Sequence, residues 1–377
     1  MIEIASLPEH SGILICGHGS RAKIAEEEFA LLSASLQTRH PTLKVAHGFL
    51  EYSAPNIHTA LDALIAQGVT TIHAVPGMLF AATHAKNDIP SVLTTYQDKH
   101  PEITIKYGQE LGLHNEMLLA FEQRIIDALS LTKRPEPGDL YDTMLVVVGR
   151  GTSVVEANAE ATKLTRIMSE NLGFGWAETV YSGVTYPSVG RGLEMAIKLG
   201  YKKIVIAPYF LFGGRLIDRI YHYVDKVAAE NPDVSFFKAD YLRAQSHVIN
   251  TFALRINETI ENQAQPKDLM ADFTERLARG EVDIHHHHAE YQPETEISNV
   301  NHSDSHSHEH SHDHSHGHSH QHGHHHAPYK HIAHPHGPRT MINDNICCCF
   351  MGQFPQEIIT EEQSTTSNNK TPVCQKK

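Results

Sequence analysis

Short apolar runs alternate with amphipathic stretches along the first 260 residues. The runs are rich in Ile, Val and Leu, as in "GILIC" and "KKIVIAP", whereas the stretches repeat apolar residues every three or four positions. The first pattern is typical of buried strands and the second of helices. Strands that alternate with helices predict parallel sheets with helices on both faces. The expected strands lie at 12–16, 43–48, 70–76, 102–108, 144–149, 177–183, 202–208 and 234–240, and the clearest helices at 25–36, 55–68, 86–99 and 114–129.

The same pattern occurs twice, at an offset of 132 residues. "GVTTIHAVPGMLF" from Gly68 matches "GYKKIVIAPYFLF" from Gly200, and "GHGS" from Gly17 matches "GRGT" from Gly149. Such a repeat indicates a tandem duplication. We therefore predict two α/β lobes of flavodoxin-like type, each a small parallel sheet with helices on both faces. They should pack as an internal pseudo-dimer with a cleft between them, in a monomeric protein.

The predicted organisation has five parts. These are an N-terminal lobe at 1–130, a polar linker at 131–142, a C-terminal lobe at 143–263, one more helix within 264–283, and a tail at 284–377. The tail is expected to be disordered, because "SHSHEHSHDHSHGHSHQHGHHH" and its flanks are too polar and repetitive to form a core. Its "HEHSH" matches a metalloprotease pattern, but that pattern needs a helix, which alternating Ser, Gly and His do not favour.

Composition narrows the function classes. The net charge of −13 argues against a general nucleic-acid binder. No apolar run reaches the length of a membrane span, and the N-terminus lacks the pattern of a secretory signal, so we expect a soluble cytoplasmic protein. Cys16 is the one cysteine of the duplicated body, which excludes a disulfide scaffold there. Neither a P-loop nor a "GxSxG" elbow occurs.

Three polar side chains follow predicted strands of the first half. His18 follows the first strand, Glu51 the second and His84 the third. Parallel sheets bind ligands beyond the carboxyl ends of their strands, so these side chains should converge. Two imidazoles and a carboxylate suit a divalent cation such as Zn, Fe, Co or Ni. The neighbouring Gly17 and Gly19 would allow a tight turn around His18.

The second half serves as a control for this site. Adding 132 turns His18 into Arg150, Glu51 into Gly183 and His84 into Leu216, while framework positions persist. The sequence therefore predicts one metal site, in the first half. Four further residues are not assigned as metal ligands. Cys16 and His73 are predicted to be core residues, and His114 is predicted to be a helix cap that aligns with His247. For His47 both a core and a site position stay open.

Three motifs of the body together resemble a known family. "LICGHGSR", "FLEYSAPNI" and "VPGMLFAATHAKNDIP" are similar to the class II sirohydrochlorin chelatases, and a His-rich stretch after two such halves resembles their long-form cobaltochelatases. The resemblance implies insertion of Co(II) into sirohydrochlorin for anaerobic cobalamin synthesis, with no nucleotide consumed. It implies metal ligation by His18, Glu51 and His84, with His18 or His84 accepting a pyrrole proton.

The implied substrate carries many carboxylates, so cations should line its site. Arg150 is the first candidate, followed by Arg21, Lys86 and Arg215. The tail would store or supply metal through its repeated histidines, among them His306, His308, His310, His312, His314, His316, His318 and His320. An iron–sulfur cluster is not expected, because Cys347, Cys348 and Cys349 are consecutive and Cys374 is distant.

Other interpretations stay open at the level of sequence. The nearest is the same reaction with Fe(II), for sirohaem, and Ni(II) is a further candidate metal. A second is a non-enzymatic metal-binding protein or metallochaperone. A third is a flavodoxin-like nucleotide binder, which the missing phosphate motifs disfavour. One complete ligand set in one half favours an asymmetric catalytic site over storage.

Overall fold

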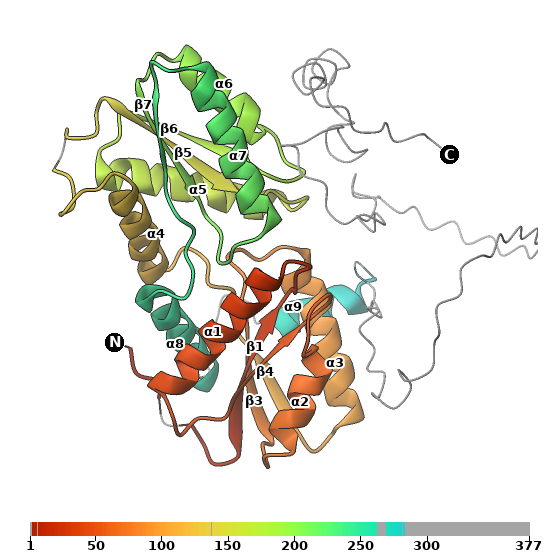
Figure 1. Ribbon diagram of the computed structural model, residues 1–377. Coiled ribbons are helices and arrows are strands. Elements are labelled where there is room, and N and C mark those ends of the chain that lie inside the picture. Colours follow the sequence, from red (N-terminus) through yellow and green to blue (C-terminus); the bar gives the residue numbers. More distant parts are fainter. Residues whose placement is uncertain (1, 6, 137, 262–268, 281, 283–377) are drawn as a thin grey trace, which may run out of the picture.

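The computed structural model describes residues 2–5, 7–136, 138–261, 269–280 and 282 (Figure 1). Within them the chain forms two four-stranded parallel sheets, one per lobe, and all eight predicted strands are present. The first sheet has the order β2-β1-β3-β4 and the second the order β6-β5-β7-β8. The strands are β1 (Ser11–Gly17), β2 (Val45–Phe49), β3 (Thr71–Pro76), β4 (Thr104–Tyr107), β5 (Thr143–Gly149), β6 (Trp176–Tyr181), β7 (Lys203–Pro208) and β8 (Ser235–Lys238).

Strand register confirms the duplication. Ile13 pairs with Val45 and His73 in the first sheet, and Leu145 pairs with Ala177 and Val205 in the second, each at the offset of 132. The offset changes before the last strand, since Thr71 lies opposite Thr104 but Lys203 lies opposite Ser235. The second half is thus one residue shorter between its last two strands.

Helices fill the intervals between strands, as predicted. They are α1 (Lys23–Arg39), α2 (Ile57–Ile65), the π-helical turn η1 (His84–Asp88), α3 (Ile89–Lys99), α4 (Asn115–Ala128), α5 (Val155–Leu172), α6 (Val189–Lys198), α7 (Arg215–Glu230), α8 (Ser246–Ile260) and α9 (Leu269–Ala278). The expectation that Pro55 starts a helix is wrong: Asn56 caps α2, its side chain accepting the N–H of Thr59 at 2.8 Å, so Pro55 precedes the cap.

The closing helices α4 and α8 are exchanged between the lobes (Figure 1). On α4, Phe121 packs edge-on against Tyr209 beyond β7, with ring centroids 5.1 Å apart. On α8, the hydroxyl of Thr259 donates to the carbonyl of Ile256 at 2.7 Å, so it accepts from Nδ1 of the buried His73 of β3 at 2.9 Å. One face of each sheet is therefore covered by the last helix of the other half, and α4 packs against α8 between the two sheets. The repeat alone does not predict this exchange.

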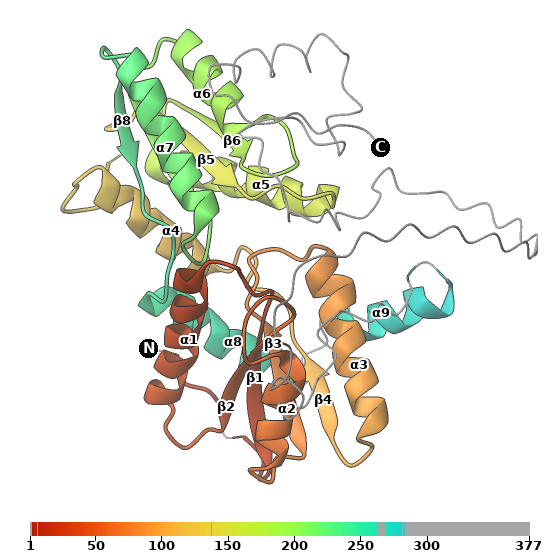
Figure 2. The same ribbon diagram turned by 45° about the vertical axis from the view of Figure 1, so that its right-hand side comes forward.

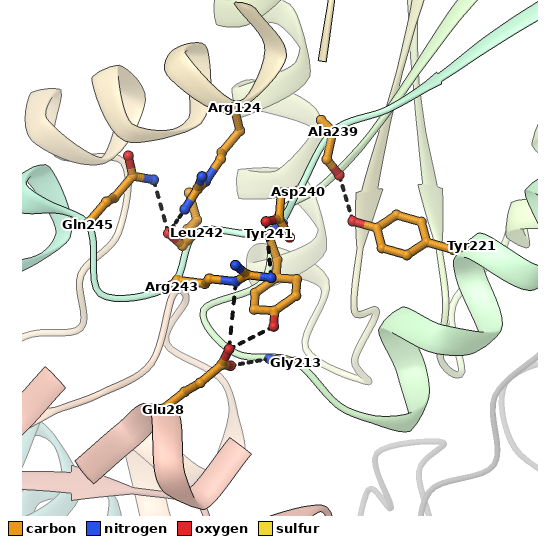
Figure 3. Close-up of polar contacts among 10 residues, drawn as sticks. All are labelled: Glu28, Arg124, Gly213, Tyr221, Ala239, Asp240, Tyr241, Leu242, Arg243 and Gln245. Atoms are coloured by element: carbon orange, nitrogen blue, oxygen red, sulfur yellow. Dashed lines mark hydrogen bonds and ion pairs between the residues drawn. The ribbon is translucent and has the colours of Figure 1, made fainter. Parts of the chain in front are cut away.

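A polar cluster joins the lobes where the chain returns from β8 to α8 (Figure 3). Glu28 of α1 accepts the backbone N–H of Gly213 and the hydroxyl of Tyr241, both at 2.7 Å. Arg124 of α4 donates to the carbonyl of Leu242 at 2.9 Å. Charge-assisted hydrogen bonds to a mostly buried carboxylate are among the stronger polar contacts, so this cluster holds α1 against the loop before α7.

Two sequence-based predictions bear on the C-terminal part. The helix expected within 264–283 is confirmed as α9. The His-rich stretch, with His306 to His320, and the cysteines Cys347, Cys348, Cys349 and Cys374 lie outside the described residues. Among the helices that are described, none is long and apolar enough to cross a membrane.

Candidate metal and substrate site

The site lies where the strand order of the first sheet reverses. From β1 the chain moves outward to β2 and then returns to the other side of β1 with β3. A crevice forms beyond the carboxyl ends of strands at such a reversal. His18 directly follows β1, and His84 begins η1 eight residues after the end of β3. Topology therefore brings the two histidines to one edge.

A tight turn brings the Glu51 backbone against His18. The N–H of Glu51 donates to the carbonyl of His18 at 3.0 Å. Gly19 has φ +93°, and a Cβ on it would lie 1.6 Å from the carbonyl oxygen of Glu51. Only glycine fits there, so the prediction that glycine makes room around His18 is confirmed for Gly19.

The three predicted ligands lie together. The imidazole rings of His18 and His84 meet edge-on, with centroids 4.1 Å apart. The Nδ1 atom of His18 is 3.4 Å from Oε1 of Glu51. Even so, no three His, Cys, Asp or Glu side chains in the described part of the chain are placed to hold a metal ion together. The arrangement is a histidine pair with a carboxylate beside it, and the three-ligand set stays a prediction.

Asp88 orients His84 from one helical turn away. Nδ1 of His84 lies 2.6 Å from Oδ2 of Asp88, a carboxylate that is 5% exposed. A carboxylate only accepts, so we assign the proton to Nδ1, which leaves the lone pair on Nε2. Metal-binding histidines are commonly held by such an outer carboxylate. Asp88 was not predicted, because the helical pattern of the sequence begins at residue 86, two residues after His84.

Electrostatics keep His18 neutral. Burial, followed by the proximity of His84 and the charge of Arg150, holds the pKa of His18 well below its usual range. Its Nδ1 atom is buried and has no hydrogen-bond partner. A neutral imidazole with a free nitrogen is the form that binds a metal ion.

The predicted cations lie in different settings. Arg150 follows β5, is exposed, and acts on His18 from the second lobe. Arg21 lies over the ring of Tyr52, with its guanidinium carbon 4.8 Å from the ring centroid. Lys86 is half-buried on η1, and Arg215 is the exposed first residue of α7. The structure connects Arg150 and Arg21 most directly with His18.

Tyr52 is a further residue at this site. Its backbone has φ +64°, its side chain is 50% exposed, and its ring is stacked near His18 at 6.3 Å between centroids. A left-handed conformation is unusual for a bulky residue and often marks a functional turn. Sequence offered one signal for it, the position directly after Glu51.

His73, His47 and Cys16 are accounted for by packing. His73 is 1% exposed, and Cys16 is fully buried, which confirms both as core residues. His47 packs against the rings of Phe29 and Phe49, and burial lowers its pKa. This packing favours the core alternative for His47.

His114 caps α4, as predicted. Its Nδ1 accepts the N–H of Glu116 at 3.2 Å. Its alignment with His247 is wrong, because the second half is shorter by one residue and the residue before α8 is Gln245. His247 instead contacts Glu116 itself, with Nδ1 2.8 Å from Oε2.

The second lobe has no room for the same site. At the position of Glu51 it has Gly183, where an added Cβ would lie 2.4 Å from the carbonyl oxygen of Arg150. At the position of His84 it has Leu216, near the start of the regular helix α7. The backbone as well as the side chains thus differs between the lobes.

Comparison with known proteins gives one family. The CbiX family model matches residues 12–128 and 144–259. The chain is 31% identical over 253 residues to the sirohydrochlorin cobaltochelatase of Priestia megaterium, covering 67% of this chain and 81% of that protein. It is 32% identical over 255 residues to the sirohydrochlorin ferrochelatase of Bacillus subtilis strain 168, covering 66% of this chain and 92% of that protein.

Solved structures agree on the fold. SirB from Bacillus subtilis with Fe³⁺ is 30% identical with a TM-score of 0.58, covering 67% of this chain and 98% of that chain. SirB from Bacillus subtilis subspecies spizizenii in complex with cobalt is 28% identical with a TM-score of 0.56, covering 67% and 96%. The matched part corresponds to the two lobes.

Proposed function

Because the chain belongs to the CbiX family of class II sirohydrochlorin chelatases, we propose that it inserts Co(II) into sirohydrochlorin without consuming a nucleotide. The observation that carries the proposal is the contact between His18 and His84 at the strand-order reversal, with rings 4.1 Å apart. The His-rich stretch of the sequence favours cobalt.

In this proposal the incoming metal is a substrate that docks on the histidine pair. His18 offers a neutral imidazole because its pKa is held low by burial. His84 offers Nε2 because Asp88 occupies its Nδ1. Glu51, 3.4 Å from His18, completes the donors. A site with few protein ligands leaves coordination positions open, so pyrrole nitrogens can replace the imidazoles one by one.

Metal insertion also requires that two pyrrole protons leave the macrocycle. As the metal passes to the pyrrole nitrogens, Nε2 of His84 is freed and can accept one of these protons. The Asp88 carboxylate, 2.6 Å from the other ring nitrogen, stabilises the imidazolium that forms. We assign the second proton to Glu51, whose carboxylate is beside His18 and partly exposed. These roles divide the histidines into a neutral ligand, His18, and a ligand that becomes a base, His84.

The macrocycle's carboxylates need cationic partners. Arg150 provides one from the second lobe, and Arg21 provides another beside the Tyr52 ring. The ring of Tyr52, next to the histidine pair, can stack on the flat face of a tetrapyrrole. Lys86 and Arg215 are secondary candidates on the surrounding elements.

Iron is the second candidate metal. The ferrochelatase of Bacillus subtilis is as similar to this chain as the cobaltochelatase is, and a related structure holds Fe³⁺. Imidazole and carboxylate bind both ions, and selectivity in such sites depends on geometry and metal supply more than on affinity order.

An anaerobic insertion assay tests the proposal. Full-length protein is mixed with sirohydrochlorin and Co(II), Fe(II) or Ni(II), and the absorbance of the macrocycle is followed. We expect acceleration over the protein-free rate, largest with Co(II), and loss of it in His18→Ala. A larger acceleration with Fe(II) assigns the ferrochelatase reaction. No acceleration with any metal, together with tight metal binding, would identify a non-enzymatic metal-binding protein.

A further inference from the structure

Helix α9 lies outside both segments matched by the CbiX model, yet it packs on the first lobe. Phe273 is fully buried, and Met270 packs against the apolar cluster under α2 and α3. Figures 1 and 2 both show α9 beside α3, and it also contacts η1. This helix therefore touches the turn that carries His84.

That turn is short of backbone donors. In η1 the N–H of Ile89 donates to the carbonyl of His84, five residues earlier. The next residue is Pro90, which has no N–H. Pro90 thus removes the donor that a π register would offer to Ala85 and that an α register would offer to Lys86. Buried carbonyls in this position need partners from elsewhere.

Two side chains supply these donors. The hydroxyl of Tyr107, at the end of β4, donates to the carbonyl of Ala85 at 3.1 Å. Arg276 of α9 donates through Nη2 to the carbonyl of Lys86 at 2.8 Å and through Nη1 to Oδ1 of Asn87 at 2.9 Å. A guanidinium offers several donors in a fixed fork, so it can hold both acceptors at once.

The second lobe shows what happens without proline. Leu216 is the counterpart of His84, and the helix that follows, "RLIDRIYHYVDKVAAE", contains no proline. There the chain forms one regular helix, α7, from Arg215 to Glu230. The π-turn thus occurs only in the lobe whose helix carries His84, among the described residues. Single π-turns are frequent at functional sites.

We propose that Arg276 is a positioning residue for His84. By fixing Lys86 and Asn87 it holds the turn in which Asp88 reaches back to His84, four residues earlier. Helix α9 is then part of the architecture of the metal site although it lies beyond the two lobes. The inference rests on the proposed function, because it assigns the effect of Arg276 to the docking of the metal.

The test compares Arg276→Ala with Arg279→Ala in the full-length protein. Arg279 directly follows α9, is exposed and pairs with Glu275 at 3.7 Å, so it is a matched control. In Arg276→Ala we expect faster amide hydrogen exchange at residues 84–92. We also expect a rise of about 10- to 100-fold in the KM for Co(II), the range typical of outer partners of metal ligands. The KM for sirohydrochlorin should not change.

Rescue and a second variant complete the design. In Arg276→Lys the exchange at residues 84–92 and the KM for Co(II) should lie between those of the wild type and Arg276→Ala. An ammonium can donate to the Lys86 carbonyl but does not make the paired contact to Asn87. If Arg276→Ala does not fold, Asn87→Ala removes one of the two contacts and leaves α9 untouched.

Three outcomes are decisive. Unchanged exchange at residues 84–92 overturns the inference, and so does faster exchange with an unchanged KM for Co(II). A wild-type protein that inserts no metal refutes the proposed function instead, while amide exchange still reports whether Arg276 holds the turn.

Discussion

The two lobes have the same strand order and register, but the ends of their first strands differ. In the first lobe the Gly19 turn places Glu51 against His18, and η1 brings His84 to them. In the second, Arg150 follows the corresponding strand, and Gly183 is needed because a side chain would collide with the Arg150 carbonyl. One copy thus presents two histidines and a carboxylate, and the other a cation. After a duplication, the residues at one strand end can change while those of the other copy are kept. Two different strand ends suit a reaction that joins a metal ion to an anionic macrocycle.

The largest difference between the lobes is expected when His84 and its counterpart in the second lobe, Leu216, are replaced separately. His84→Ala should lower turnover at least about 100-fold, because the proposed function gives this side chain the roles of both ligand and base. Leu216→Ala, the same position in the second lobe, should leave turnover unchanged. Anaerobic insertion kinetics measure both, with circular dichroism to check folding. Equal losses in the two variants would show that the lobes are not functionally different.

The lobes should also differ in their response to acid. Burial, followed by the charge of Lys106, lowers the pKa of His73 from 6.5 to about 4, whereas its counterpart is Val205. The unfolded state takes up the proton first, so stability is lost as pH falls from about 6.5 towards 4. The loss can reach on the order of 3 kcal/mol. Its Nε2 has no partner, so a proton there would be buried without a hydrogen bond.

Urea unfolding between pH 7 and 4.5 measures this effect. His73→Gln keeps a donor for Thr259 and should reduce the slope of stability against pH. His222→Gln, at an exposed residue of the second lobe, should leave the slope unchanged. Identical slopes in all three proteins would mean that His73 is not responsible for the acid sensitivity.

A smaller effect is expected at the cation of the second lobe. Arg150→Ala should raise the KM for sirohydrochlorin about tenfold through the loss of a charged contact. Because the charge of Arg150 lowers the pKa of His18, its removal should also move the acidic limb of the rate profile to higher pH. The control is Arg166→Ala, which removes an exposed arginine that pairs with Glu170 on α5. An unchanged KM would remove Arg150 from the substrate site.

The smallest effect on turnover should come from the tail. Deletion of residues 284–377 should lower the number of metal ions bound, because it removes twenty histidines between His285 and His336. Turnover at saturating metal should stay within about twofold, since the tail acts only on local metal concentration. Metal analysis and insertion kinetics on one preparation test this. A collapse of turnover in a folded body would make the tail part of the reaction.

Much of the first lobe's site was predictable because strand ends carry it. His18, Glu51 and His84 each follow a strand that periodicity identified, and topology then brings them together. Asp88 and Arg276 were not predictable in the same way. Asp88 depends on a helix that begins two residues earlier than its pattern indicates, and Arg276 contacts Asn87 and Lys86 from 189 and 190 residues away in the chain.

The exchange of α4 and α8 was also beyond the sequence pattern. Periodicity shows that a helix follows β4 and another follows β8, but both sheets offer an apolar face of the same kind. The choice depends on how the whole surfaces of the two lobes fit, which includes contacts such as Phe121 with Tyr209. Local amphipathicity contains no information on which of two similar faces a helix will cover.

This exchange makes the halves interlocking rather than separable. The segment 131–142 connects α4 to β5, and both already belong to the second sheet, so a proteolytic cut there severs no bridge between the lobes. The fragment before the cut would contain the first sheet, but its α4 covers the second sheet. The fragment after the cut would contain the second sheet, but its α8 covers the first. Each piece alone would expose one uncovered face, so the nicked molecule is a complementing pair whose members depend on each other to stay folded.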